Sequence, residues 1–406
     1  MNDDLSRELL ISIAGEYGTP VYVYNADKIK SQYDRLSRAF QKLPVRIFYA
    51  GKALTNINIL RYIHSLGASV DCSSINEVRL ALYGGIIPEH ILYTSNSIPF
   101  SEIEEAQRLG VHINIDSLSA LEKFGKRFGN SYPVGIRVRP NVMAGGNLQI
   151  STGHDKSKFG IPIDQFEKIL KVVKKYNMHI TLLHVHTGSG ISDADLYMKA
   201  VNHLLDIVKY FPDLECVDLG GGFKVPFKED DSEADVDLIA GEVKKAIDNI
   251  QTKVGKKLQL WIEPGKFLVS AAGYLIATTD VIKETSTVTF AGVDTGFNHL
   301  IRPMFYGAYH QILNLSNPEG QLKKYAVVGN ICETDTFAWD RDIPEIREGD
   351  LIVFKNAGAY GFEMASNFNS RFRPPEVLVK DGEPILIRRR ESLEDLVKNQ
   401  IISNKI

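Results

Sequence analysis

The chain has few cysteines and no marked excess of charge of either sign. Cys72, Cys216 and Cys332 are the only cysteines among 406 residues, so neither a disulfide framework nor a cysteine zinc site is expected. Its 47 lysines and arginines against 50 aspartates and glutamates give a formal net charge of -3, which provides no general attraction to nucleic acid or anionic lipid. We therefore expect a cytoplasmic protein that acts on small molecules and has no nucleic-acid partner.

Long apolar runs are missing as well. None approaches the roughly 20 residues that a membrane-spanning helix needs, so no membrane association is expected. The segment Met1–Leu10 lacks the basic stretch and apolar run of a secretory signal. With 44% hydrophobic and 24% charged residues, the composition is that of a globular protein. Because 406 residues exceed the length at which a single core usually stops growing, two domains are expected.

Short β-rich apolar runs alternate with helical patterns from about residue 45 to residue 262, which indicates βα architecture. The expected strands are Val45–Ala50, Ser69–Cys72, Ile91–Tyr93, Val111–Ile115, Val134–Arg137, Ile180–His186, Cys216–Leu219 and Leu258–Ile262. Polar or glycine signals follow many of these strands, whereas a doubly wound sheet would concentrate them after one or two. The sequence therefore predicts a TIM-type (β/α)8 barrel.

A mainly β C-terminal domain is expected after the barrel, because the helical alternation fades beyond about residue 270. Strand-like runs separated by glycine and proline turns take its place, at Val288–Val293, Lys324–Gly329, Asp350–Phe354 and Glu376–Val379. We predict a barrel domain over 28–270 and a β domain over 271–406, with residues 1–27 packed against the β domain. Val21–Tyr24 is a strand that could join either domain, and Ser392–Ile402 has the spacing of a closing helix.

In a closed barrel, the residues that end the strands meet at one face, where active sites of this fold lie. These strand-end residues are Lys52, Asp71, Arg137, His186, Gly220–Gly222 and Glu263. By position alone a lysine is more often solvated at the surface, but one desolvated here would favour the neutral amine that Schiff-base chemistry needs. A histidine by itself is more often a satisfied core residue than a catalyst.

Two loops could hold an anion. Asp218–Phe223 places Gly220, Gly221 and Gly222 after a strand, where bare backbone amides can approach a phosphate, although such a run is often only a turn. Ser189, in the loop after His186, supplies a hydroxyl that could join the same site. A third segment, Glu263-Pro264-Gly265-Lys266, forms a sharp turn that presents a carboxylate at the barrel mouth.

The C-terminal half carries a polar cluster of its own. Cys332 and Glu333 are adjacent, and Tyr360 lies in an alanine- and glycine-rich segment, Ala357–Gly361. Arg302 and Tyr306 add a guanidinium suited to bidentate carboxylate recognition and a phenol. Without context, Cys332 would be a small buried hydrophobe and Arg302 a surface ion-pair partner.

Taken together and in this order, these segments resemble the alanine-racemase-like, fold-type III pyridoxal phosphate (PLP) decarboxylases, and within them the diaminopimelate decarboxylase family. The resemblance extends over nearly the whole chain. The motifs that carry it are Phe48–Ala53, Ile150–Gly153, Ser157–Gly160, His186–Ser189, Gly220–Gly222, Glu263–Gly265, Cys332–Glu333 and Ala357–Gly361. One departure is Lys266, where the common family motif has arginine, so the two-pronged fork is lost there.

The resemblance implies a role for each of these residues. PLP would be carried by Lys52 and contacted by His186, with Glu263 facing its pyridine nitrogen and so strengthening the ring as an electron sink. Its phosphate end would be held by Ser189, Gly220, Gly221, Gly222, Pro264, Gly265 and Lys266. Substrate or cofactor polar groups would meet Lys266, Arg302, Tyr306, Glu333 and Tyr360, and Cys332 would donate a proton. The family's homodimers share active sites, so Cys332 and Glu333 would complete the partner subunit's site.

The activity so implied is decarboxylation of meso-2,6-diaminopimelate at its D-centre to give L-lysine and carbon dioxide, the last step of lysine biosynthesis. Alternatives of the same fold act on ornithine, arginine, lysine or carboxynorspermidine, and a racemase or a noncatalytic PLP-binding homeostasis protein is a further reading. A metal-dependent barrel could use His184 and His186, which lie two apart on one face of a strand, but the sequence indicates no third ligand. No metal is therefore expected.

Overall fold

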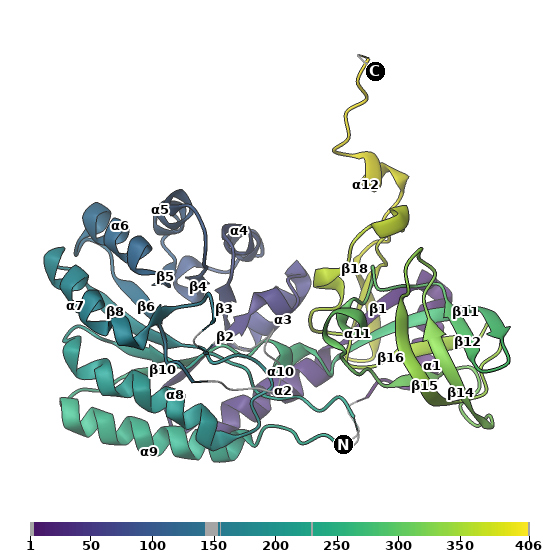
Figure 1. Ribbon diagram of the computed structural model, residues 1–406, viewed down its shortest axis with the longest axis horizontal. Helices are drawn as coiled ribbons and strands as arrows, with labels where there is room; N and C mark the ends of the chain where they lie inside the picture. The colour runs from purple at the N-terminus through teal and green to yellow at the C-terminus, as the bar shows by residue number, and fades with distance from the viewer. Residues whose placement is uncertain (1–3, 143–152, 155, 229, 405–406) are drawn as a thin grey trace. The chain divides into compact units, whose positions relative to one another are not determined.

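The computed structural model describes residues 4–142, 153–154, 156–228 and 230–404. The chain divides into two compact units. The barrel unit contains residues 30–226 and 232–268, and the β unit contains residues 1–29, 227–231 and 269–406 (Figure 1). Of the motifs predicted above, Ile150, Ser151 and Thr152 lie outside the described residues. None of the described helices is long and apolar enough to cross a membrane.

The barrel unit is built on parallel strands that close into a ring. In ring order these are β2 (Val45–Ala50), β3 (Ser69–Cys72), β4 (Ile91–Thr94), β5 (His112–Ile115), β6 (Val134–Arg139), β8 (Ile180–Val185), β9 (Cys216–Asp218) and β10 (Gln259–Ile262). The pairing of β5 with β6 and of β10 with β2 closes the sheet, and the two-residue β7 (Ile161–Pro162) extends β6. All eight predicted strands are present, so the predicted (β/α)8 barrel is confirmed.

The barrel helices lie on the outside of the sheet; the first precedes the first barrel strand, and the others follow barrel strands (Figure 1). They are α2 (Ala26–Ala39), α3 (Ile57–Ser65), α4 (Ile75–Tyr83), α5 (Phe100–Arg108), α6 (Leu118–Phe128), α7 (Phe166–Lys175), α8 (Ala194–Ile207), α9 (Val236–Val254) and α10 (Lys266–Val269). Side chains of Asn56, Ser74, Ser117, Asp193 and Asp235 accept hydrogen bonds from first-turn amides, which otherwise lack partners. These capping residues define where α3, α4, α6, α8 and α9 begin.

The β unit contains a mixed sheet in the order β15-β14-β12-β11-β1-β17-β18, with β16 pairing β11 and β13 pairing β16. Its strands are β1 (Val21–Asn25), β11 (Gly273–Glu284), β12 (Thr289–Val293), β13 (Ile312–Asn314), β14 (Leu322–Val328), β15 (Thr336–Pro344), β16 (Leu351–Phe354), β17 (Glu376–Lys380) and β18 (Glu383–Arg388). The N-terminal strand pairs with β11 and β17, which settles the ambiguity over Val21–Tyr24. A mainly β second domain is thus confirmed.

Among its described residues, the β unit also has the helices α1 (Arg7–Tyr17), α11 (Arg302–Tyr306) and α12 (Leu393–Val397). Leu10 and Ile13 of α1 pack with Val23, Ile276 and Val377 in the core of the unit. The predicted helix over Ser392–Ile402 is shorter than expected, since α12 ends at Val397. A capping box at Ser392 starts the helix, but Ile401 and Ile402 are more than nine-tenths exposed, so no packing prolongs it.

Candidate active site

The carboxyl ends of the barrel strands bring the predicted cofactor residues to one face of the barrel unit. Lys52 lies in a 3-10 turn (Gly51–Ala53) directly after β2, and His186 directly follows β8. The glycine run 220–222 and Glu263 come just after β9 and β10. Because these parallel strands form a closed ring, their carboxyl ends share one rim.

The Lys52 amine lies beside a buried carboxyl group. Its Nζ is 3.5 Å from Oδ2 of Asp71 on β3, and the lysine side chain is 40% exposed whereas that of Asp71 is 1% exposed. Burial, reinforced by the charge of Glu263 and opposed by that of Lys52, raises the pKa of Asp71 to about 8. With this raised pKa, Asp71 can be neutral or ionised near neutral pH. The Lys52 amine, which reaches solvent beside this carboxyl, is suited to attack a carbonyl group.

Glu263 lies in a group of three buried polar side chains. Its Oε2 is 3.4 Å from Nε2 of His184, and ligand atoms of these two residues and of Asp218 lie within 4.8 Å of one another. Burial and the charge of Glu263 raise the pKa of Asp218 well above its usual value. Although burial opposes ionisation of Glu263, the pKa of this carboxyl is lowered by His184 and Lys52. We conclude that Glu263 is the ionised member of the carboxyl pair and Asp218 the protonated one.

Apart from the neighbouring Asp218 carboxyl, the other carboxylate oxygen of Glu263, Oε1, has no hydrogen-bond donor in the described part of the chain. Leaving a buried charged oxygen without a donor is costly, so this atom is suited to a cationic N–H group brought by a ligand. A protonated pyridine nitrogen is such a group. The orphaned oxygen therefore fits PLP.

The ring of His186 is held by the glycine run. The Gly221 amide donates to Nδ1 of His186 over 3.3 Å, so Nδ1 carries no proton. Burial, with the charges of Arg137 and Lys52, holds the pKa of His186 well below its usual value. The imidazole is therefore neutral and offers a flat face to an aromatic ligand.

Glycine is required in this run because the backbone approaches its neighbours closely. A Cβ at Gly220 would overlap the His186 ring, and one at Gly221 would overlap the carbonyl of Glu263. The amides of Gly220 and Gly221 already donate to Asp218 Oδ1 and His186. Within the described residues, only the Gly222 amide of the run lacks an acceptor, so this amide is the one suited to a phosphate.

The remaining cofactor residues flank this rim. The loop that holds Ser189 is joined to the glycine run, because the amides of Gly190 and Ile191 both donate to the Gly222 carbonyl over 2.9 Å. The Pro264 carbonyl accepts the Ala50 amide over 3.1 Å, which fixes the Glu263 turn beside the end of β2. A Cβ at Gly265 would crowd Ala50 and Ala53, and Lys266 begins α10.

Arg137 is a buried cation that the sequence marked only as a strand end. It lies on β6, and its guanidinium carbon is 4.9 Å from the centre of the Phe159 ring. Burial lowers its pKa, whereas the negative charges of Glu263, Asp116 and Asp71 raise it. Arg137 therefore balances part of the acidic charge that faces the site.

His184, Asp218 and Glu263 together offer three possible metal ligands, whereas the sequence alone indicated only two histidines. It differs from the metal site considered above, because His186 is not among the three. Asp218 Oδ1 already accepts the Gly220 amide over 2.8 Å. The two carboxyl groups and the imidazole thus form a buried polar network. Whether this network binds a metal ion can be tested by chelation.

In the β unit, Arg302, Tyr306 and Tyr360 form a second predicted group. Arg302 begins α11 and is 9% exposed, and its guanidinium carbon lies 5.4 Å from the ring centre of Phe227 and 5.8 Å from that of Tyr306. Burial lowers the pKa of Arg302, while the phenols of Tyr360 and Tyr306 oppose this. Its Nε has no acceptor among the described residues, which suits a carboxylate ligand.

Cys332 and Glu333 lie in the loop between β14 and β15 and are both exposed. Cys72 and Cys216 are buried. The reading of Cys332 as a small buried hydrophobe is therefore wrong, because the loop presents its thiol to solvent.

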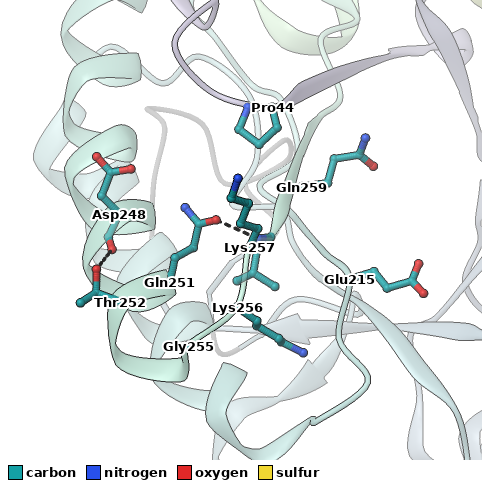
Figure 2. Close-up of a pocket in the computed structure, with 10 residues that line it drawn as sticks. Pro44, Glu215, Asp248, Gln251, Thr252, Gly255, Lys256, Lys257 and Gln259 are labelled. Atoms are coloured by element: carbon teal, nitrogen blue, oxygen red, sulfur yellow. Dashed lines mark hydrogen bonds between the residues drawn. The ribbon is translucent and has the colours of Figure 1, made fainter.

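Two hollows at the opposite end of the barrel are not part of this site. The larger, of about 950 Å³, is lined by residues that precede or begin strands, such as Pro44, Glu215 and Gln259 (Figure 2). Its polar groups are engaged locally: Gln251 accepts the Leu258 amide and the Lys256 ammonium donates to Pro212. The smaller, of about 480 Å³, is lined by Arg46, His112 and Trp261, among others. Neither contains a residue of the predicted chemistry.

Comparison with known proteins shows the family of the chain. A family model for the "Pyridoxal-dependent decarboxylase, pyridoxal binding domain" matches residues 26–270. A diaminopimelate decarboxylase from Methanothermobacter thermautotrophicus is 37% identical over 406 residues, covering 98% of this chain and 95% of the relative. One from Escherichia coli K12 is 33% identical, covering 98% of each chain.

A solved diaminopimelate decarboxylase from Helicobacter pylori, complexed with L-lysine, superposes with a TM-score of 0.89 at 32% identity, covering 96% of this chain and 98% of that one. Another, from M. jannaschii, has a TM-score of 0.90 at 30% identity, covering 97% and 95%. At this coverage, each superposition includes residues of both the barrel unit and the β unit. This chain belongs to the diaminopimelate decarboxylase family of pyridoxal-dependent decarboxylases.

Proposed function

We propose that this protein decarboxylates meso-2,6-diaminopimelate at its D-centre and releases L-lysine and carbon dioxide. The observation that carries the proposal is the buried carboxylate of Glu263, whose orphaned oxygen shares one barrel rim with the Lys52 amine and the His186 ring. When bound there, PLP supplies an electron sink for the charge left as carbon dioxide departs.

Each barrel residue has a definite task in this proposal. Lys52 would be the residue that holds the cofactor, and its partly exposed amine would give up that place to the amine of the substrate. Glu263 would face the pyridine nitrogen and favour its protonated form, and the neutral His186 ring would contact the cofactor. Ser189, the Gly222 amide and the turn of Pro264, Gly265 and Lys266 hold the phosphate end.

The β-unit residues would recognise the substrate. Arg302, with its free Nε and the phenols of Tyr306 and Tyr360 nearby, suits the distal carboxylate. Glu333 would take the distal ammonium group, and Cys332 would protonate the carbon that has lost carbon dioxide. Lys266, which replaces the family arginine, keeps the positive charge but makes a less directed contact.

We further propose a cytoplasmic homodimer in which Cys332 and Glu333 complete the partner subunit's active site, with 28–270 and 271–406 as the two domains. The exposure of both residues in a single chain is consistent with this arrangement. Mixing inactive Lys52→Ala and Cys332→Ser proteins under subunit exchange should restore part of the activity. If mixing restores none while exchange is verified, the shared site is wrong.

The reaction itself is tested by carbon dioxide release from PLP-loaded protein across meso-diaminopimelate, its L,L isomer, ornithine, arginine and lysine. We expect release only from the meso compound, with L-lysine formed. Lys52→Ala should abolish release and the borohydride-fixable cofactor, whereas Lys42→Ala, at an exposed residue, should retain both. Preference for another amino acid would overturn the substrate, and no release from any would favour a racemase or a noncatalytic PLP-binding protein.

A further inference from the structure

We propose that Asn369 is a positioning residue that orients the Cys332 thiol and stabilises its thiolate. The inference rests on the proposed function, in which Cys332 donates the proton to the decarboxylated carbon. It concerns a residue that carried no signal in the sequence.

Asn369 holds Cys332 at two atoms. Its side-chain oxygen accepts the Cys332 backbone amide over 2.7 Å, and its side-chain nitrogen donates to Sγ over 2.9 Å. Oxygen and nitrogen of an asparagine amide are interchangeable in shape, so their assignment depends on the partners. A backbone N–H can only donate, which requires the oxygen on that side and therefore turns the NH₂ group toward the sulfur.

The segment that presents Asn369 is itself fixed. Ser366 donates its amide to the Asn298 carbonyl over 2.7 Å, and Arg371 donates to the Asn330 carbonyl over 3.0 Å. Between them, the Phe368 ring stacks on Phe297, with centroids 5.7 Å apart and an angle of 19° between the ring planes. Contacts on both sides of Asn369 thus fix this segment: Arg371 ties it to the loop that carries Cys332, and Ser366 and Phe368 tie it to the residues after β12.

Asn369 also has a backbone conformation that only a few residue types adopt readily. Its φ is +57°, in the left-handed region that asparagine tolerates better than most side chains. Asparagine combines that tolerance with an amide long enough to reach the neighbouring loop. Asparagine is therefore suited to this position, because it tolerates the backbone conformation and its side chain makes both hydrogen bonds.

The consequence for proton transfer follows from the sulfur contact. As the S–H bond of Cys332 breaks, its proton forms the new C–H bond and the electron pair remains on sulfur. The Asn369 N–H group faces that developing negative charge, and hydrogen bonds to charged groups are the stronger ones. The thiolate is later reprotonated from solvent.

Two variants separate this role from folding. Asn369→Gly keeps the left-handed backbone but removes both hydrogen bonds, whereas Asn369→Asp keeps the oxygen toward the Cys332 amide and turns a carboxylate oxygen toward sulfur. We expect kcat to fall roughly tenfold in the first and further in the second, with KM for meso-diaminopimelate little changed. Asn177→Ala, at an exposed asparagine of φ +48° in the barrel unit, is the control for backbone strain and should keep its kcat.

A second readout needs no substrate. Alkylation of the holoenzyme by iodoacetamide at pH 7 should label Cys332 selectively, since the other two cysteines are buried, and a Cys332→Ser protein gives the background. Because the thiolate is the reacting form, labelling should slow severalfold in Asn369→Gly and further in Asn369→Asp. Unchanged labelling in Asn369→Asp, or reduced labelling with an unchanged kcat, would overturn the proposal. Full activity of Cys332→Ser would instead overturn the proton-donor role, which is a failure of the proposed function.

Discussion

The Nε2 atom of His184 lies 3.4 Å from Oε2 of Glu263, and both side chains are at most 4% exposed. This contact is one reason why the pKa of Glu263 is lowered in spite of its burial. His184 therefore helps to keep Glu263 ionised.

Replacing His184 by phenylalanine should raise the pKa of Glu263 and so move the acidic limb of the kcat/KM profile to higher pH. At pH 7 we expect kcat/KM to fall about tenfold, the order expected for losing one polar contact to a buried charge. The absorption spectrum of the bound cofactor should change its pH dependence in the same direction. His203→Phe on the exposed face of α8 is the matched control, and an unchanged acidic limb in His184→Phe would show that the contact has no electrostatic role.

Gly221→Ala should destabilise the site, because the new Cβ would overlap the Glu263 carbonyl. Overpacking of this kind costs roughly 1–3 kcal/mol, so we expect a lower Tm and weaker retention of PLP. Gly241→Ala in α9 is the matched control, since nothing lies within 4 Å of its added Cβ. In a helix interior alanine is favoured over glycine by about 0.5–1 kcal/mol, so the control should melt no lower than the parent. Equal melting of the two variants would contradict the steric argument.

Much of the barrel could be predicted from sequence because each strand is an apolar run bounded by polar residues. Val45–Ala50 and Ser69–Cys72 have the predicted bounds, and the other six runs differ by one or two residues at one end. The residues just after the strands were found by the same logic. Lys52 and Glu263 follow strands, and closure of the ring makes all strand ends neighbours.

The supporting residues could not be predicted in the same way, because their roles depend on which side chains face one another after closure. From sequence, His184 was expected to have a structural role, and Asp218 was noted only as the first residue of the glycine-containing turn 218–223. Their contact with Glu263 joins β8, β9 and β10, whose pairing is not a local property of the sequence. Asn369 lies 37 residues from Cys332, and no periodicity links the two.

The β unit should lose stability as the pH falls, because it buries a neutral histidine. Burial, with the charges of Arg302 and Arg341 nearby, lowers the pKa of His310 to about 4. In an unfolded chain a histidine titrates near 6.5, so below that pH the unfolded state binds the extra proton and is favoured. The stabilisation is complete above about pH 6.5 and is lost between there and pH 4.

Between pH 7 and pH 5 this group should cost about 2 kcal/mol, since each pH unit within the window is worth roughly 1.4 kcal/mol. His310→Asn keeps a donor for the Lys355 carbonyl, which His310 Nδ1 contacts at 2.8 Å, but cannot titrate. Its Tm should therefore change less between pH 7 and pH 5 than that of the parent or of His203→Asn. A parallel decrease in all three proteins would place the acid sensitivity elsewhere.

Removal of metal and removal of cofactor should have opposite outcomes. His184, Asp218 and Glu263 offer three donor atoms within 4.8 Å, so a bound divalent cation there is a concrete rival to the cofactor reading. In our interpretation Asp218 is protonated and accepts the Gly220 amide, and Glu263 is reserved for the pyridine nitrogen. We therefore expect dialysis against EDTA to leave carbon dioxide release unchanged, whereas stripping PLP with hydroxylamine abolishes it and added PLP restores it. Loss of activity on chelation, regained with zinc or manganese but not with PLP, would assign these three residues to a metal instead.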